Sequence, residues 1–255
     1  MKIDRPALKG RAKALVTGSK PSPIWVGLVY LLLVIIVSLL STRIMGITLT
    51  VQEFSKYSDA ILTGDYDYIY NLLAPRMPGP AAYIINLALQ LVLTVVSAGF
   101  VLFLMNTVRR TGACFGNLLD GFGMIGRIIL LNILEGLFIT LWSLLFVIPG
   151  IIAAYRYRMA LYLLLDHPEM SVMQCIRESK QMMKGHKGEL FVMDLSFIGW
   201  AILESIPGLG YAVQVWTTPY ISMSYVLYYE ALRGAETVND AGNGGSWRET
   251  PPWEG

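Results

Sequence analysis

The sequence predicts an all-α membrane protein, because the chain is unusually apolar, its charge-free runs are long, and those runs lack the alternation of β-strands. Of its 255 residues, 55% are hydrophobic and 15% are charged, whereas soluble domains typically carry about 25% charged residues. Runs without Asp, Glu, Lys or Arg cover residues 24–42, 77–108 and 205–229. About 18 apolar residues suffice to cross a bilayer, and a spanning run without period-2 alternation is expected to be helical. This composition excludes an ordinary cytosolic enzyme, a disordered chain and a small disulfide-stapled secreted domain.

The expected architecture is a polytopic membrane helix bundle over residues 24–233, between a basic leader at residues 1–23 and a tail at residues 234–255. The dipeptides Pro149-Gly150 and Pro207-Gly208 favour turns and are expected to follow the third and fifth spans. The tail lacks apolar periodicity, so it is expected to be disordered. The six transmembrane helices are predicted at about residues 24–45, 81–108, 126–148, 151–165, 190–206 and 211–232.

The positions of the basic residues predict that both termini are cytoplasmic. With the amino terminus inside, fifteen of the 20 Lys and Arg residues fall in the leader, the second and fourth connections and the tail. Three of them, Arg43, Lys56 and Arg76, fall outside. Short cytoplasmic loops carry an excess of Lys and Arg, which decides the orientation. The one long external connection, residues 46–80, is rich in Tyr and Asp and is expected to be an interfacial segment or a ligand-binding lid.

Four charged residues are predicted to lie deep inside spans, at similar depths on three helices. A charge near the bilayer centre is costly, so each should face the protein interior and find a partner. We therefore expect a buried ionic cluster in which one of the two arginines pairs with both acids. The cluster is either a structural contact between helices or a site for a substrate or an ion. Its residues are Glu135, Arg156, Arg158 and Asp194.

Residues 169–184 are predicted to form a basic amphipathic helix that lies on the inner membrane surface. Ser171 and Gln174 have the spacing of a capping box, and Gly185 is suited to end a helix. Apolar residues recur at spacings of three and four, and basic residues lie among them or opposite. The segment is either a structural elbow between two spans or an element that binds an anionic lipid or a protein partner. The candidate lipid contacts are Arg177, Lys180, Lys184 and Lys187.

No motif for catalysis, metal binding or cofactor binding is predicted. Gly121, Gly123 and Gly126 match a dinucleotide-binding pattern, but no strand candidate precedes them, so they are interpreted as a flexible loop. The two histidines stand alone, the two cysteines form no Cys-x-x-Cys, and no Gly-x-Ser-x-Gly or Walker motif occurs. A net charge of +2 gives no reason to expect a nucleic-acid partner. We expect no cofactor and no enzymatic activity.

Several short motifs occur together in this chain, and they are densest over residues 148–229. They are Ile148-Pro149-Gly150-Ile151, Tyr155-Arg156-Tyr157, Asp166-His167-Pro168-Glu169, Ser179-Lys180, Met183-Lys184-Gly185-His186-Lys187, Leu190-Phe191, Asp194-Leu195-Ser196-Phe197-Ile198-Gly199-Trp200, Pro219-Tyr220 and Tyr228-Tyr229. In these motifs the chain resembles the bacterial integral membrane family called domain of unknown function 975, over roughly residues 1–234. It departs from the family pattern at His167 and at Glu204-Ser205-Ile206-Pro207. The resemblance implies a six-helix protein of the bacterial plasma membrane and implies no activity.

The expected function is that of a non-enzymatic binding or regulatory component that contacts lipid or a protein partner. The alternative is a small permease or flippase that uses the charged residues predicted within helices three to five. An enzyme would need positioned acid and base groups, and only Glu135 and Asp194 are candidates for them.

The predicted orientation can be tested by labelling single cysteines in intact cells, in a background without the two native cysteines. We expect an impermeant thiol reagent to label S58C, in the external connection, and to label S246C, in the tail, only after permeabilisation. The basic-residue distribution is the physical reason. Labelling of S246C with protection of S58C in intact cells would reverse the topology.

Overall fold

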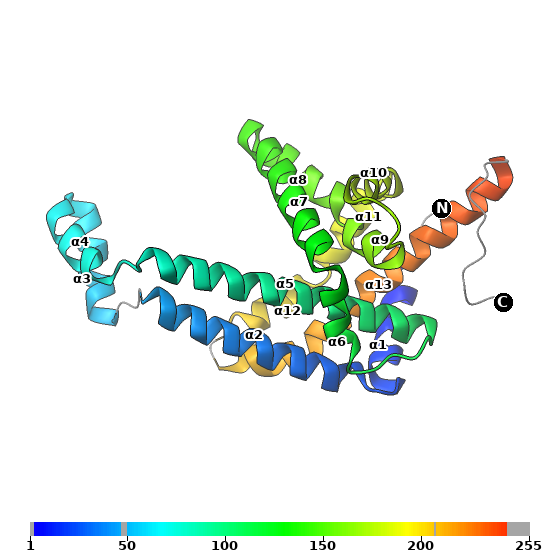
Figure 1. Ribbon diagram of the computed structural model, residues 1–255, viewed down its shortest axis with the longest axis horizontal. Coiled ribbons are helices and arrows are strands. Elements are labelled where there is room, and N and C mark those ends of the chain that lie inside the picture. Colours follow the sequence, from blue (N-terminus) through cyan, green and yellow to red (C-terminus); the bar gives the residue numbers. More distant parts are fainter. Residues whose placement is uncertain (1–2, 47–49, 207, 244–255) are drawn as a thin grey trace. The chain divides into compact units, whose positions relative to one another are not determined.

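The computed structural model describes residues 3–46, 50–206 and 208–243, and every regular element within these ranges is a helix (Figure 1). The predicted all-α class is therefore confirmed for the described part of the chain. Three helical stretches are long and apolar enough to span a membrane: α2 (Pro23–Met45), α5 (Pro80–Arg109) and the run Asn117–Leu145. This last run contains α6 (Asn117–Asp120), η2 (Gly121–Met124) and α7 (Ile125–Leu145). They correspond to the first three predicted spans.

The chain divides into two compact units, and residues 29–94 form the smaller one. This unit contains most of α2, the short helices α3 (Val51–Thr63) and α4 (Tyr66–Leu73), η1 (Ala74–Arg76) and the start of α5. Arg76 lies 2.5 Å from Glu53 and joins η1 to the start of α3. Hydrogen bonds from Arg76 and Thr50 lower the pKa of Glu53 to about 2. Apolar side chains of α3 and α4 are exposed, including Leu62 and Tyr66, as an interfacial segment requires.

The larger unit comprises the residues on either side, and α1 (Arg5–Gly18) and α13 (Leu209–Asn243) pack together within it. Leu8, Ala12 and Val16 recur every four residues, so they share one face of α1, and all three are buried. The basic leader of the sequence analysis is therefore a helix docked on the protein. α7 and α8 (Val147–Tyr157) also lie side by side, as the green ribbons in Figure 1 show.

A pair of glycines lets the α6 region cross α5 at very short range. A Cβ atom added to Gly99 would lie 2.3 Å from the carbonyl oxygen of Leu118, and one added to Gly121 would lie 2.5 Å from that of Val95. Both contacts are with backbone atoms, which have little room to move. Gly121 therefore belongs to a tight helix crossing. The interpretation of the glycine motif as a flexible loop is wrong, because Gly121 and Gly123 lie in η2 and Gly126 lies in α7.

The expected turn at Pro149-Gly150 is displaced toward the amino terminus. Helix α7 ends at Leu145, Phe146 is extended at φ −161°, and α8 begins at Val147. Pro149 thus lies in the first turn of α8, where proline is tolerated because the first helical N–H groups have no partner within the helix. The other expected turn contains Pro207, which lies outside the described residues, and Gly208 beside it has a positive φ of 82°.

The fourth and fifth predicted spans are broken helices. The fourth consists of α8 and α9 (Ala160–Asp166), separated at Arg158 and Met159. The fifth consists of α11 (Lys187–Leu195) and α12 (Ile198–Glu204), separated at Ser196 and Phe197. The prediction of continuous helices is wrong at both places, and each break adjoins a charged residue of the predicted cluster.

Helix α13 is longer than the sixth predicted span. It continues to Asn243 with Pro219 in its interior, so disorder immediately after Gly234 was wrongly expected. Adding residues to an existing helix avoids the cost of nucleation, and Ala235 and Glu236 are compatible with this continuation. Residues 244–255 lie outside the described part, and so does the prediction for them.

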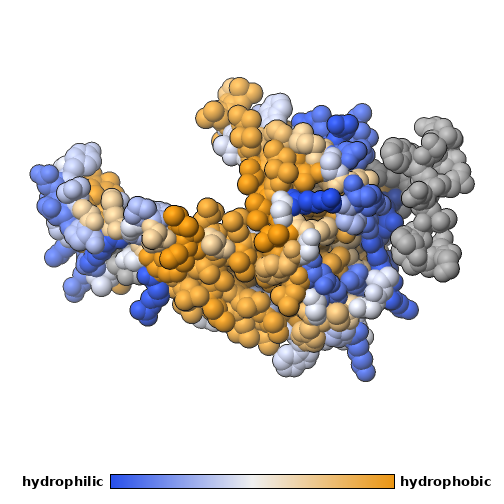
Figure 2. Space-filling view, viewed as in Figure 1, coloured by the Kyte–Doolittle hydropathy of each residue, from blue (hydrophilic) through white to orange (hydrophobic). Residues whose placement is uncertain are grey.

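The basic amphipathic segment contains α10 (Val172–Met182), and its predicted start is confirmed. Ser171 and Gln174 form both hydrogen bonds of the capping box. The apolar face does not lie free for a membrane, however, because Val172, Ile176 and Met182 are buried and α10 packs on α7, α8, α9 and α13. The apolar face is therefore covered by protein, and the position of the helix on the inner membrane surface stays a prediction. Figure 2 shows a largely hydrophilic surface over α10 and a hydrophobic one over α7 and α8.

Candidate functional site

The four charged residues of the predicted cluster lie on three helices of the larger unit. Glu135 is in the middle of α7, Arg156 and Arg158 are at the carboxyl end of α8, and Asp194 is at the end of α11. Arg158 interacts electrostatically with both acids, Glu135 and Asp194. Three of the four residues are thus brought into one region, as the sequence predicts.

Hydrogen bonds from two tyrosines hold Asp194. The hydroxyl of Tyr155 donates to one carboxylate oxygen at 2.8 Å, and that of Tyr225 donates to the other at 2.7 Å. The guanidinium of Arg158 lies over the ring of Tyr225, 4.7 Å from its centroid, an arrangement that attracts a cation to an aromatic face. Tyr225 therefore contacts both Asp194 and Arg158.

The expected direct ion pairs within this cluster are absent from the described residues. None of the four side chains there has an oppositely charged group within 4.0 Å. The pairing hypothesis is therefore wrong in its direct form, because phenolic hydroxyls satisfy Asp194 and an aromatic ring covers Arg158. Oε1 of Glu135 is buried and has no hydrogen-bond partner among the described atoms.

The break between α8 and α9 is stabilised by a serine of α10. The Ser179 hydroxyl donates to the carbonyl oxygen of Arg156 at 2.9 Å and accepts from the backbone N–H of Met159 at 3.1 Å. Ser179 is fully buried. Backbone groups released at a helix break need such partners in apolar surroundings. Arg156 therefore contributes to this break through its backbone carbonyl group, which accepts the hydrogen bond from Ser179.

A second polar cluster, which the sequence analysis missed, joins α5, α9 and α13. Arg109 donates two hydrogen bonds to the carboxylate of Asp166, at 2.5 and 2.9 Å, and Nε of Arg109 lies 2.7 Å from Oε1 of Glu230. The Tyr229 hydroxyl donates to Asp166 at 2.7 Å, and Arg233 lies 3.4 Å from the same carboxylate. The side chain of Asp166 is 6% exposed. We call these five residues the Asp166 network.

Two cations and two acids balance one another in the Asp166 network. Burial alone would raise the pKa of Asp166, but hydrogen bonds from Arg109 and Tyr229 and the charges of Arg109 and Arg233 lower it below its ordinary value. Asp166 is therefore ionised at neutral pH and links the ends of α5 and α9 to the middle of α13. One signal was available in the sequence, because Glu230 falls within the sixth predicted span, where a charge needs a partner.

The candidate lipid contacts remain on the surface. Arg177, Lys180 and Lys184 are exposed, and Lys187 is half-buried. No carboxylate of the described chain lies within 4.0 Å of these four side chains. We refer to the four residues as the α10 basic surface. The described residues also contain no group of three or more His, Cys, Asp or Glu side chains suited to hold a metal ion.

Residues 144–236 match the family model described as "Protein of unknown function (DUF975)". The description of this family assigns it no function. The match confirms the resemblance over the part of the chain that holds Asp194 with its two tyrosines, Ser179 and most of the Asp166 network. Arg109 and Glu135 lie outside it, so each cluster combines residues within and outside the matched segment. Comparison with curated proteins and with solved structures gives no match.

Replacing Asp166 with Asn should destabilise the protein by about 3 kcal/mol at neutral pH, because removal of one partner of a buried ion pair leaves the other uncompensated. Denaturant or thermal unfolding in detergent measures the loss. The control E169Q changes an acid whose side chain is 68% exposed and should alter stability by less than about 1 kcal/mol.

The pH dependence of unfolding of the wild type and of D166N gives a second test, in which the direction of the change in stability can be stated in advance. The pKa of Asp166 is lowered in the folded state, so its contribution is present above the unfolded value of about 3.9 and is lost as the pH falls through the folded value. The stability difference between wild type and D166N should therefore shrink below about pH 4. A difference of constant size across this range would contradict the role given to the carboxylate.

Proposed function

We propose that the chain is a multi-pass protein of the bacterial plasma membrane, with both termini in the cytoplasm, that acts by binding and not by catalysis. In this proposal the α10 basic surface binds anionic lipid at the inner face of the membrane. A protein partner with an acidic surface is the other ligand compatible with this chemistry. Three helices of sufficient length and apolarity support the membrane assignment.

One observation carries the binding proposal: Arg177 and Lys180 are exposed on α10, whose apolar face is already packed against the protein, and Lys184 and Lys187 follow this helix in the chain. A helix fixed in this way presents its charges without first inserting into lipid, and a capping box at Ser171 defines its start. Each Lys or Arg near an anionic membrane surface contributes about 1 kcal/mol of attraction. Four adjacent bases therefore favour anionic over zwitterionic lipid.

Lipid selectivity of the purified full-length protein tests the proposal. We expect phosphatidylglycerol to be enriched over phosphatidylcholine around the wild type in mixed nanodiscs, and R177Q/K180Q/K184Q/K187Q to lose most of this enrichment. High salt should weaken it, since exposed charges are screened. Lipid extraction and mass spectrometry give the ratio.

The matched control is R43Q/K56Q, which removes charges from the side predicted to be external. It should keep the enrichment for phosphatidylglycerol. Equal lipid ratios for the wild type and the α10 variant would contradict the lipid proposal, and binding of an acidic protein by the wild type alone would favour a protein partner.

A transport function is the second candidate, and the broken helices favour it. Discontinuous helices that meet near charged residues are typical of transporter binding sites. Here the breaks at Met159 and Ser196 adjoin Arg158 and Asp194, and Glu135 has a buried carboxylate oxygen without a hydrogen-bond partner among the described atoms.

Aqueous access distinguishes a transport path from a closed polar cluster. If water reaches the cluster, E135C in a background without native cysteines should react with a small charged thiol reagent. L137C, on an exposed apolar position of the same helix, should face lipid and stay unreactive because the reagent requires a hydrated thiolate. An unreactive E135C in a folded protein would contradict the transport alternative.

A further inference from the structure

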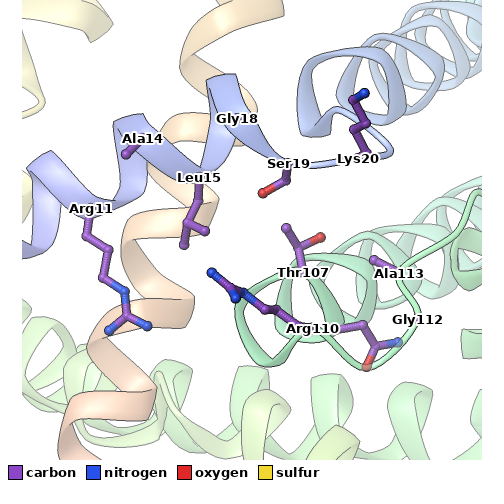
Figure 3. Close-up of a pocket in the computed structure, with 11 residues that line it drawn as sticks. Arg11, Ala14, Leu15, Gly18, Ser19, Lys20, Thr107, Arg110, Gly112 and Ala113 are labelled. Carbon is purple, nitrogen blue, oxygen red and sulfur yellow. The ribbon is translucent and has the colours of Figure 1, made fainter.

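A cleft of about 750 Å³ lies between the carboxyl ends of α1 and α5 in the larger unit. Its lining includes three cationic side chains, Arg11, Lys20 and Arg110, and no acidic residue. Figure 3 shows the guanidinium of Arg110 reaching from the end of α5 toward α1, where Arg11 extends toward the same space. No described carboxylate lies within 4.0 Å of any of the three cations.

The backbone at Arg110 is unusual and directs this side chain. Helix α5 ends at Arg109, and Arg110 follows in the left-handed region with φ 59°, the only non-glycine residue with positive φ in the described chain. The N–H of Thr111 bonds to the carbonyl of Asn106 at 3.1 Å, which is the closure of a Schellman motif. Glycine normally occupies the left-handed position of this motif because an L side chain is strained there. An arginine in the place of glycine therefore points to a use for its side chain.

Arg109 and Arg110 are neighbours with opposite surroundings. Arg109 is neutralised by Asp166 and Glu230, whereas Arg110 is exposed and faces the cleft with two other cations. Polar groups complete the lining: Ser19 and Thr107 contribute hydroxyls, and Asn106 contributes an amide. The amide oxygen of Asn106 accepts from Thr111 at 3.1 Å, so its nitrogen is the side available as a donor.

We infer that this α1–α5 cleft binds a phosphate group. Guanidinium groups form paired hydrogen bonds with phosphate oxygens, and the cleft is within the usual range of small-molecule sites. The position of the cleft favours a lipid headgroup as the source of the phosphate, because the cleft lies beside the start of α2 at Pro23 and the end of α5 at Arg109. Two candidate spans thus end there, at the level expected for lipid headgroups. The site is separate from the α10 basic surface and goes beyond the function proposed for it.

The test measures binding to purified full-length protein in a neutral detergent by isothermal titration calorimetry. The probes are dioctanoyl phosphatidylglycerol, dioctanoyl phosphatidylcholine and inorganic phosphate. We expect the anionic lipid to bind and R110Q to weaken it by about tenfold or more, as loss of one charged hydrogen-bonding partner should. Binding of inorganic phosphate with competition against the lipid would identify a free phosphate compound as ligand, and binding of the lipid alone would identify the headgroup.

Two further variants separate a loss of binding from a loss of folding or of net charge. R110G should unfold at the same or a higher temperature than wild type, because glycine suits the left-handed conformation, and should still lose the binding. K13Q removes an equal charge from an exposed position of α1 outside the cleft lining and should bind as wild type does. The inference would be overturned if neither dioctanoyl phosphatidylglycerol nor inorganic phosphate bound the wild type, or if R110G bound its ligand as tightly as the wild type does. Loss of binding here with intact lipid enrichment at α10 would leave the proposed function standing.

Discussion

The ion pair between Arg109 and Asp166 joins the ends of α5 and α9 to α13, and much of the larger unit depends on it. Arg109 ends α5 and Asp166 ends α9, and Glu230 and Tyr229 of α13 bind the same pair. A charge left alone in this poorly hydrated place would be costly, so the four helix-borne groups are stable only together. Because α13 also carries α1, the network indirectly sets the position of the amino-terminal helix.

The two broken helices show how the chain satisfies polar groups in apolar surroundings. A break releases backbone N–H and C=O groups, and Ser179 takes one of each at the α8–α9 break. The charge beside each break needs a partner too, and tyrosine supplies it: Tyr225 donates to Asp194 and its ring lies beneath Arg158. Phenol is suited to this role, because its ring packs among apolar side chains while its hydroxyl donates. The polar centre is therefore held together without a direct ion pair.

Hydropathy predicted the long helices well and the broken ones poorly. Helices α2 and α5 agree with the first two predicted spans, because each is apolar along its whole length. A window average cannot detect the breaks at Met159 and Ser196, since these depend on partners such as Ser179 from a distant part of the chain. Likewise, the charges at Glu135, Arg158 and Asp194 were expected to gather, but spacing alone does not reveal that tyrosines would replace ion pairs.

The amphipathic segment illustrates a second limit of periodicity. The apolar spacing and the capping box predicted α10 and its start at Ser171, and both are present. Periodicity reports that one face is apolar, whereas the identity of the surface covering that face depends on tertiary structure. Here the cover is protein, since Ile176 and Met182 are buried against neighbouring helices.

Pairing divides the basic residues predicted to be cytoplasmic into two classes with different physical effects. Arg109 and Arg233 have acidic partners in the Asp166 network and contribute little field outside the protein. Arg110 and the α10 bases have no described carboxylate within 4.0 Å, so their charge remains available to anions. A count of Lys and Arg is enough to orient the chain, but attraction of an anionic surface depends only on the unpaired class. Two consecutive residues at the end of α5 belong to different classes. Arg109 is still helical and its side chain binds Asp166, whereas the left-handed backbone of Arg110 directs its side chain toward the cleft.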